Sequence, residues 1–182
     1  MQVLVIVVVI SGILSMLGNY YTARNGGLGA LFMLLSYVIN FFLAVGVTMI
    51  ALNVFDQKPA TLKMLYADPA VVWRYFLATV LYMLIILGGT ILLIVPGIIW
   101  AIKYSQYKYI VIEKNIGPWE ALKLSGRITK GSRWNIFFFF VLVGLLNVLG
   151  AIVLGVGLLV TIPVSMMASV WVYRKLLGRG EA

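Results

Sequence analysis

The sequence predicts an all-α, polytopic transmembrane helix bundle with about six spanning helices. Hydrophobic residues make up 63% of the 182 residues, only 10% are charged, and the mean hydropathy is +1.09. A soluble globule of this size needs more polar surface than that, so lipid is the expected solvent. The apolar residues form long continuous runs rather than alternating strips of about ten residues, which favours helices over a membrane β-barrel.

Each apolar run is long enough, or nearly long enough, to cross the bilayer as a helix. About 20 residues at 1.5 Å per residue span a hydrocarbon core of about 30 Å. The first run is the shortest, but Asn19, Tyr20 and Tyr21 after it do not form a small-residue cleavage site, so we expect it to span the membrane. The whole chain is thus one integral membrane domain. The predicted spanning helices cover residues 2–18, 29–55, 69–95, 95–112, 134–152 and 154–173.

The short connections between the helices carry capping and turn residues. Asp68 and Pro69 are suited to begin the third helix, because an Asp caps free backbone N–H groups and a Pro fits the first turn. Tight turns are expected at Pro96-Gly97 and at residues 155–157, where Gly and Pro interrupt the apolar pattern.

The basic residues predict the orientation, because cytoplasmic loops of membrane proteins carry the excess of Lys and Arg. With six crossings, eleven basic residues fall on one face and only Arg24 falls on the other, so both termini are expected in the cytoplasm. Trp73, Trp119, Trp134 and Trp171 fall at the same membrane interface, where Trp is enriched. The eleven are Lys58, Lys63, Arg74, Lys114, Lys123, Arg127, Lys130, Arg133, Arg174, Lys175 and Arg179.

The connection at 118–130 predicts an amphipathic helix that lies in the headgroup plane. Pro118 suits its first turn, and charged residues recur every three or four positions from Glu120 to Lys130. Trp119 is expected on the opposite, apolar side. The alternative is a solvated helix that only positions the next span. A second, shorter interfacial helix is indicated near 59–66. Expected lipid-binding residues are Trp119, Lys123, Arg127, Lys130, Arg133 and Trp134.

Lys103 is the leading candidate for a site inside the membrane. It lies about ten residues, or about 15 Å, from the expected start of its helix near Leu93. An ionisable group at that depth costs about 2.5–3.5 kcal/mol and is a functional candidate by default. No Asp or Glu occurs in a predicted span, so an anion, a lipid phosphate or a polar network must pair with it. The alternative is a Lys that snorkels to the interface. Expected companions are Tyr104, Gln106, Tyr107 and Asn40, whereas Lys108 is expected among the headgroups.

Two strings resemble a broad bacterial and archaeal group of small integral membrane proteins of unknown function. They are PGIIWAIKYSQYKYIVIE from Pro96 to Glu113 and GPWEALKLSGRITKGSRW from Gly117 to Trp134. Related domains are fused to some glycerophosphodiester phosphodiesterases as their membrane part. The resemblance implies a six-helix fold and a prokaryotic cytoplasmic membrane, but no activity, because the catalytic domain has no counterpart in this chain. Matching residues are Pro96, Gly97, Lys103, Tyr104, Glu120, Ala121, Leu122, Lys123, Lys130, Gly131 and Trp134.

Two classes of function agree with the composition. A non-catalytic protein that organises lipid or partner proteins is favoured by the amphipathic basic segments. A small transporter or channel for an anionic or amphiphilic solute is the alternative, favoured by Lys103, by Pro163 and by a repeat of Pro, Leu-Lys, Trp and Phe at an offset of 59 to 61 residues. That repeat is equally explained by chance similarity between amphipathic linkers.

An enzyme is not expected, because Cys and His are absent and no acidic residue falls in a span. No cofactor and no metal are therefore expected. The expected partners are membrane lipids, mainly anionic, with a second copy of the chain or another membrane protein as further partners. Nucleic acid is not expected despite the net charge of +9, because basic loops in a membrane protein report orientation and anionic headgroups.

Overall fold

The computed structural model describes residues 9, 12–13, 15–22, 26–59, 64, 68–152 and 157–180. These residues form helices, turns and short connections, and no strand occurs among them. The all-α class is therefore confirmed. The helix expected over 2–18 and the short interfacial helix near 59–66 lie mostly outside the described residues. The helices are α2 (Gly26–Phe55), α3 (Pro69–Leu92), α4 (Ile94–Tyr104), α5 (Tyr107–Lys114), α6 (Pro118–Ile128), α7 (Arg133–Ile152) and α8 (Leu158–Gly180).

Three of these helices are long and apolar enough to cross a membrane: Met33–Phe55 within α2, Pro69–Leu92 and Arg133–Ile152. The expected six spans are not confirmed in the described part of the chain. α4 has only 11 residues and α5 only 8, so each is too short to span by itself. α8 is charged near its end, where Arg174, Lys175 and Arg179 lie, so its apolar part reaches only about 24 Å.

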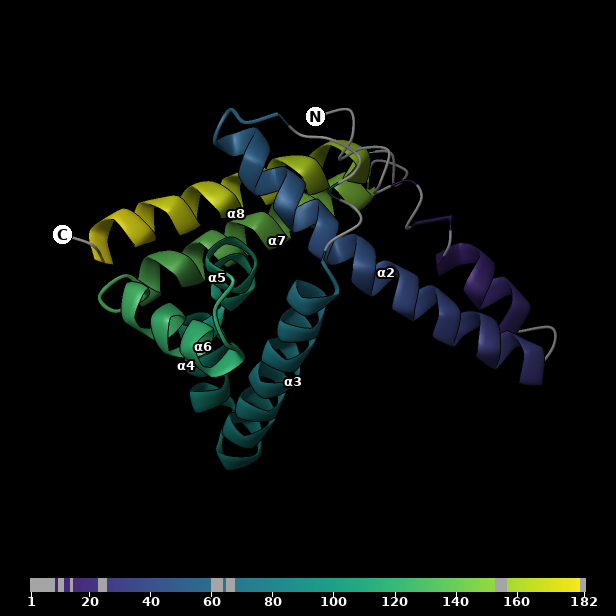
Figure 1. Ribbon diagram of the computed structural model, residues 1–182, viewed down its shortest axis with the longest axis horizontal. Helices are drawn as coiled ribbons and strands as arrows, with labels where there is room; N and C mark the ends of the chain where they lie inside the picture. The colour runs from purple at the N-terminus through teal and green to yellow at the C-terminus, as the bar shows by residue number, and fades with distance from the viewer. Residues whose placement is uncertain are drawn as a thin grey trace.

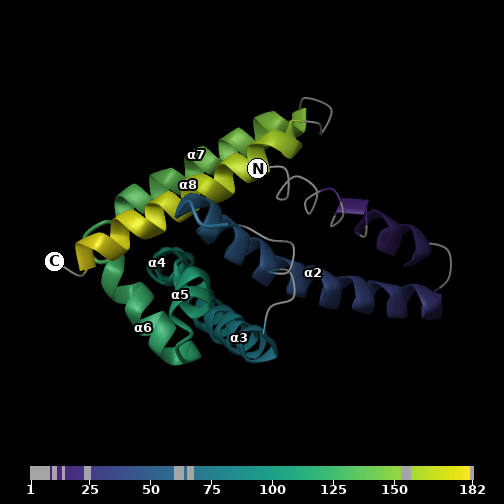
Figure 2. The same cartoon turned by 45° about the horizontal axis from the view of Figure 1, so that its top comes forward.

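The helices form two hairpins, α3 with α4 and α7 with α8, and both α2 and α6 contact members of each hairpin. α7 and α8 lie side by side as a hairpin in both views, and α3 returns along α4 and α5 (Figures 1 and 2). The C-terminal half of α2 packs on α5 and α8, and its N-terminal half extends away from α3 to α8, beside the helical residues 15–22 (Figure 1). α6 lies across one end of α4 and α5. The short helix α5 is thereby surrounded by α2, α3, α6 and α8.

The α3–α4 turn lies at Leu93, not at Pro96-Gly97 as expected. Leu93 alone interrupts the two helices, and its extended backbone ends α3 and begins α4. Pro96 fits inside the first turn of α4, because that turn does not use its backbone N–H groups. Gly97 is instead a packing residue: a Cβ there would lie 3.1 Å from the Cα of Thr90. Asp68 begins α3 as predicted, with its Oδ1 accepting from the backbone N–H of Ala70 at 2.9 Å.

The helix expected over 95–112 is divided into α4 and α5 at Ser105 and Gln106. Hydroxyl groups from α6 supply the hydrogen bonds that the break removes. The carbonyl of Lys103 accepts from Ser125 Oγ at 3.2 Å and from Thr129 Oγ1 at 2.9 Å, and Ser125 Oγ accepts from the N–H of Gln106 at 3.1 Å. Buried backbone groups that lose their partners within a helix need other hydrogen-bond partners, and neighbouring hydroxyls supply them here.

The core lies where α5 meets the surrounding helices. Its fully buried members include Ile110 and Val111 of α5, Leu122 of α6 and Tyr173 of α8. Tyr109 stacks on Tyr173 with ring centroids 5.2 Å apart. Many large apolar side chains elsewhere are exposed, mostly along α2, α3, α4 and α7. An outer surface of this kind is suited to hydrocarbon rather than water.

Candidate functional site

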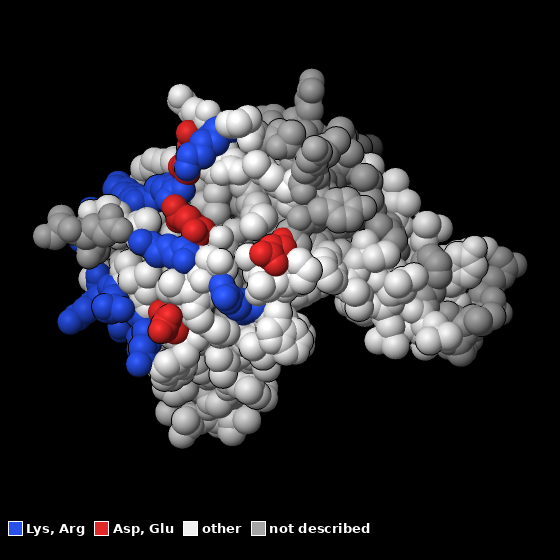
Figure 3. All heavy atoms as spheres, in the orientation of Figure 1, with Lys and Arg blue, Asp and Glu red and all other residues white. Residues whose placement is uncertain are grey.

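The charged side chains of the described residues gather at one end of the molecule. In the view of Figure 3, Lys, Arg, Asp and Glu cover the part built by α5, α6 and the ends of α2 and α8, while the far end of the α3–α4 hairpin shows no charge. We call this part the basic end. The charges are confined to this end because the chain from Tyr75 to Ile102 carries no charged residue, and the first half of α8 carries none either. The arrangement places headgroup-binding chemistry beside an apolar surface.

α6 separates a charged outer face from a buried inner face. Ala121, Leu122, Ser125 and Ile128 are buried, and Glu120, Lys123 and Arg127 are exposed. Glu120 also caps the helix, because its Oε2 accepts from the N–H of Gly117 at 3.4 Å. The amphipathic helix expected over 118–130 is therefore present.

One assignment on α6 is wrong: Trp119 does not lie on its apolar side. The indole is 55% exposed, and the Lys123 Nζ lies over it, 5.5 Å from the ring centroid. Trp119 occupies the first turn, where the buried face of the short helix has not yet begun. Exposed Trp and Lys side chains together suit a membrane interface.

A groove of about 600 Å³ opens between α4 and α7 next to the basic end. Its floor is apolar and its rim is basic, and we call it the α4–α7 groove. The rim is the turn before α7, where Gly131 adopts φ +82°, a conformation that Gly accommodates. This turn places Lys130 and Arg133 on either side of Gly131, and Trp134 follows. The lining residues are Val95, Ile98, Ile99, Ile102, Lys130, Gly131, Arg133, Trp134 and Phe137.

A second cavity, of about 460 Å³, adjoins this groove and shares Ile98, Ile102 and Phe137 with it. Apart from Tyr82 and Ser105 its lining is apolar, with Ala101, Phe140 and Val141 as the other members. The two cavities together form an apolar track along α4 and α7 that begins at a pair of basic side chains. That arrangement matches one anionic headgroup followed by an acyl chain.

Lys103 does not form the expected network with Gln106, Tyr107 and Asn40. Its aliphatic stem runs along α6, where a Cβ on Gly126 would lie 3.0 Å from the Lys103 Cε. Its Nζ lies 4.7 Å from the centroid of the Tyr104 ring. The break after Tyr104 is the reason, because it turns Tyr107 toward α3 instead of leaving it one helical turn beyond Lys103.

The other expected companions of Lys103 have separate partners. The Tyr107 hydroxyl donates to Thr79 Oγ1 at 3.1 Å, and the Gln106 side-chain amide donates to Ser105 Oγ at 3.0 Å. Asn40 lies on α2, where its amide donates to the carbonyl of Ser36 at 2.9 Å. Asn40 lines a cavity with Lys108, a lysine expected among the headgroups.

An ionic cluster at the basic end was not foreseen from the sequence. The Arg174 guanidinium binds both carboxylate oxygens of Asp56, with Nε to Oδ1 at 3.0 Å, and it also binds Glu113. The Tyr173 hydroxyl donates to Glu113 as well. Partial burial alone would lower the pKa of Arg174, but the hydrogen bonds to Glu113 and Asp56 raise it above its ordinary value. The cluster joins the ends of α2, α5 and α8.

No signal in the sequence could have found this cluster. Asp56 and Glu113 lie 118 and 61 residues from Arg174, so no local pattern connects them. The described residues contain no group of three acidic side chains arranged to hold a metal ion.

Comparisons with protein-family models, curated proteins and solved structures found no match to this chain. The resemblance to the small prokaryotic membrane proteins therefore stays a prediction.

Proposed function

We propose that the protein is a non-catalytic integral membrane protein that binds anionic lipid at its basic end and thereby organises lipid or partner proteins. The observation that carries this proposal is the α4–α7 groove, where Lys130 and Arg133 stand at the rim of an apolar track. Each basic residue near an anionic membrane surface contributes about 1 kcal/mol to binding. Trp134 at the same rim is an interfacial anchor.

The α6 helix supports the same proposal from a neighbouring surface. Lys123 and Arg127 are exposed on it beside Trp119, so its outer face is suited to lie among anionic headgroups. In this proposal the basic end faces the cytoplasm of a prokaryotic cell, in its cytoplasmic membrane. Cytoplasmic leaflets are negatively charged, and cytoplasmic loops are enriched in Lys and Arg.

The groove is tested by replacing its two basic residues. The Lys130→Gln/Arg133→Gln variant and the wild type are placed in bilayers that mix phosphatidylcholine with a minor fraction of phosphatidylglycerol. Native mass spectrometry then counts the retained lipids of each kind. At about 1 kcal/mol per residue, the preference for phosphatidylglycerol should fall about thirtyfold in the variant.

A matched control separates the groove from general surface charge. Lys123→Gln/Arg127→Gln removes the same charge from the outer face of α6, where neither residue lines the groove. This variant should lose less of the preference than the groove variant does, because Lys123 and Arg127 meet headgroups at the surface but do not line the groove. Equal losses in the two variants would show that only diffuse charge attracts the lipid, and no loss in either would exclude the groove.

The proposed orientation is tested by cysteine labelling, which is clean because the chain has no native Cys. Tyr21 and Gly178 are both exposed, and a Cβ on Gly178 meets nothing within 4 Å. In intact cells, Tyr21→Cys should react with an impermeant maleimide and Gly178→Cys should react only after permeabilisation. The reverse pattern would place the basic end outside the cell.

The alternative function is transport of an anionic or amphiphilic solute. The break between α4 and α5 supports it, because transporter sites are often built at discontinuous helices whose backbone lines a cavity. Flux of an organic anion into vesicles containing the purified protein would favour this alternative. The lipid-binding proposal is preferred because the α6 hydroxyls already occupy the backbone groups at the break.

A further inference from the structure

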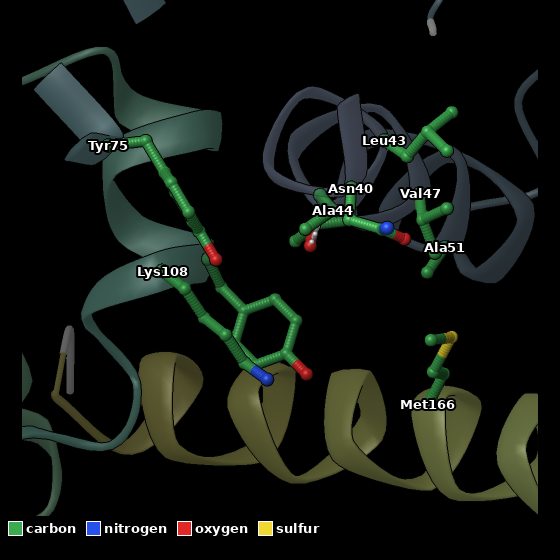
Figure 4. Close-up of a pocket in the computed structure, with 10 residues that line it drawn as sticks. Asn40, Leu43, Ala44, Val47, Ala51, Tyr75, Lys108 and Met166 are labelled. Atoms are coloured by element: carbon green, nitrogen blue, oxygen red, sulfur yellow. Dashed lines mark hydrogen bonds between the residues drawn. The ribbon is translucent and has the colours of Figure 1, made fainter. Parts of the chain in front are cut away.

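A third cavity lies on the opposite side of α5 from α6, and Lys108 of α5 lines it. It measures about 310 Å³ and lies between α2, α3, α5 and α8. Figure 4 shows Tyr75 and Lys108 on one side of the cavity and Asn40, Ala44 and Val47 of α2 on the other, with Met166 of α8 below. The lining is completed by Leu43, Thr48, Ala51 and Tyr109.

The α2 wall of this cavity is shaped by small residues. Ala44, Thr48 and Ala51 recur every three or four positions on one face, so their short side chains leave space opposite α5. Thr48 donates its hydroxyl to the carbonyl of Ala44 at 2.8 Å, so this hydroxyl is satisfied within α2. The wall is therefore apolar over most of its length.

The opposite wall carries hydrogen-bond donors. Lys108 is half-buried, and its Nζ lies 4.9 Å from the centroid of the Tyr109 ring. Within the described part of the chain, no carboxylate lies at ion-pair distance from this ammonium. The hydroxyls of Tyr75 and Tyr109 likewise have no hydrogen-bond partner among the described residues. Three donors at one cavity, with one positive charge, call for one anionic acceptor.

We propose that this cavity binds an amphiphile with a single carboxylate, such as a fatty acid, with its carboxylate at Lys108, Tyr75 and Tyr109 and its tail along α2. A lone ammonium and two phenols match the single negative charge of one carboxylate, whereas a phosphate monoester carries a charge of about −1.5 to −2. The volume lies at the lower end of the range for small-molecule sites, so a single chain fits better than a two-chain lipid. The proposal is independent of the α4–α7 groove, which uses different elements.

Binding is measured by titrating the full chain, in a neutral maltoside detergent, with dodecanoate and recording both heat of binding and the shift in melting temperature. Dodecanoate should bind and raise the melting temperature. Dodecanol, which has the same chain without the charge, should do neither. Lys108→Gln should lower the affinity for dodecanoate about tenfold or more, as expected when a charged partner of an anion is removed.

Two further variants keep the test decisive. Lys103→Gln removes an equivalent charge from outside the cavity and should bind dodecanoate as the wild type does. Ala44→Leu keeps Lys108 but fills the cavity, and it should lose binding even if Lys108→Gln fails to fold. Unchanged affinity in Lys108→Gln or Ala44→Leu, or equal binding of dodecanol, would overturn the proposal. Displacement of dodecanoate by phosphatidylglycerol at matched concentration would also overturn it, because the occupant would then be a membrane lipid.

Discussion

Replacing Arg174 by Met should lower the free energy of unfolding by about 2–3 kcal/mol, since hydrogen bonds to charged groups each contribute about 1.5–3 kcal/mol. The guanidinium is bound to Asp56 and Glu113, and the three side chains are only 20–28% exposed. Without it, two carboxylates face each other at the junction of α2, α5 and α8. Equilibrium unfolding in mixed micelles of a mild and a denaturing detergent measures the loss.

Two controls identify the cause of this loss. The Lys58 side chain is 65% exposed, and its Nζ lies 3.7 Å from Asp56 Oδ2. Lys58→Met should therefore lower the free energy of unfolding by less than about 0.5 kcal/mol. Adding Asp56→Asn and Glu113→Gln to Arg174→Met removes the unpaired charges and should restore much of the stability. A variant without Arg174 that unfolds like the wild type would mean that the cluster is only a surface contact.

The elements that could be predicted from the sequence are those with local signals. α3 follows from a continuous apolar run and from Asp68, whose carboxylate caps a backbone group two residues away. α7 follows from the run after Arg133, and α6 from the spacing of its charges. In each case the residues that determine the helix lie inside it or directly beside it, so no knowledge of tertiary contacts is needed.

The break between α4 and α5 could not be predicted in this way. The local sequence from Pro96 to Ile112 favours one helix, and the interruption depends on hydroxyls of Ser125 and Thr129, which lie 22 and 26 residues from Lys103. The same break also changes which residues lie together at the candidate site. A continuous helix would align Lys103 with Tyr107, whereas the break turns Tyr107 to Thr79 and leaves Lys108 at the α2 cavity.

The α4–α7 groove could be predicted only in part. The basic residues of its rim were identified, because charge next to Trp in a connecting segment indicates a membrane interface. Its apolar floor comes mainly from α4, more than 25 residues before the rim in the sequence. A groove is a gap between helices, so the sequence of either helix alone cannot show it.

The close approach of α3 and α4 leads to the second large expected effect. Gly97→Ala should destabilise the protein by about 1–3 kcal/mol, the usual cost of overpacking. The new methyl group would lie 2.5 Å from Thr90 Oγ1 and 3.1 Å from the Thr90 Cα and N. A side-chain hydroxyl can rotate away, but the backbone of Thr90 cannot, so the two helices must separate.

Gly88 provides the matched control on the same hairpin, because a Cβ there meets nothing within 4 Å. Gly88→Ala should therefore stabilise α3 by about 0.5–1 kcal/mol, since Ala loses less backbone entropy than Gly in a helix. The two substitutions add the same methyl group, yet the unfolding free energies in mixed micelles should move in opposite directions. If both variants were stabilised, Gly97 would not be at a tight helix contact, and α4 would have to lie farther from α3 than the geometry at Thr90 requires.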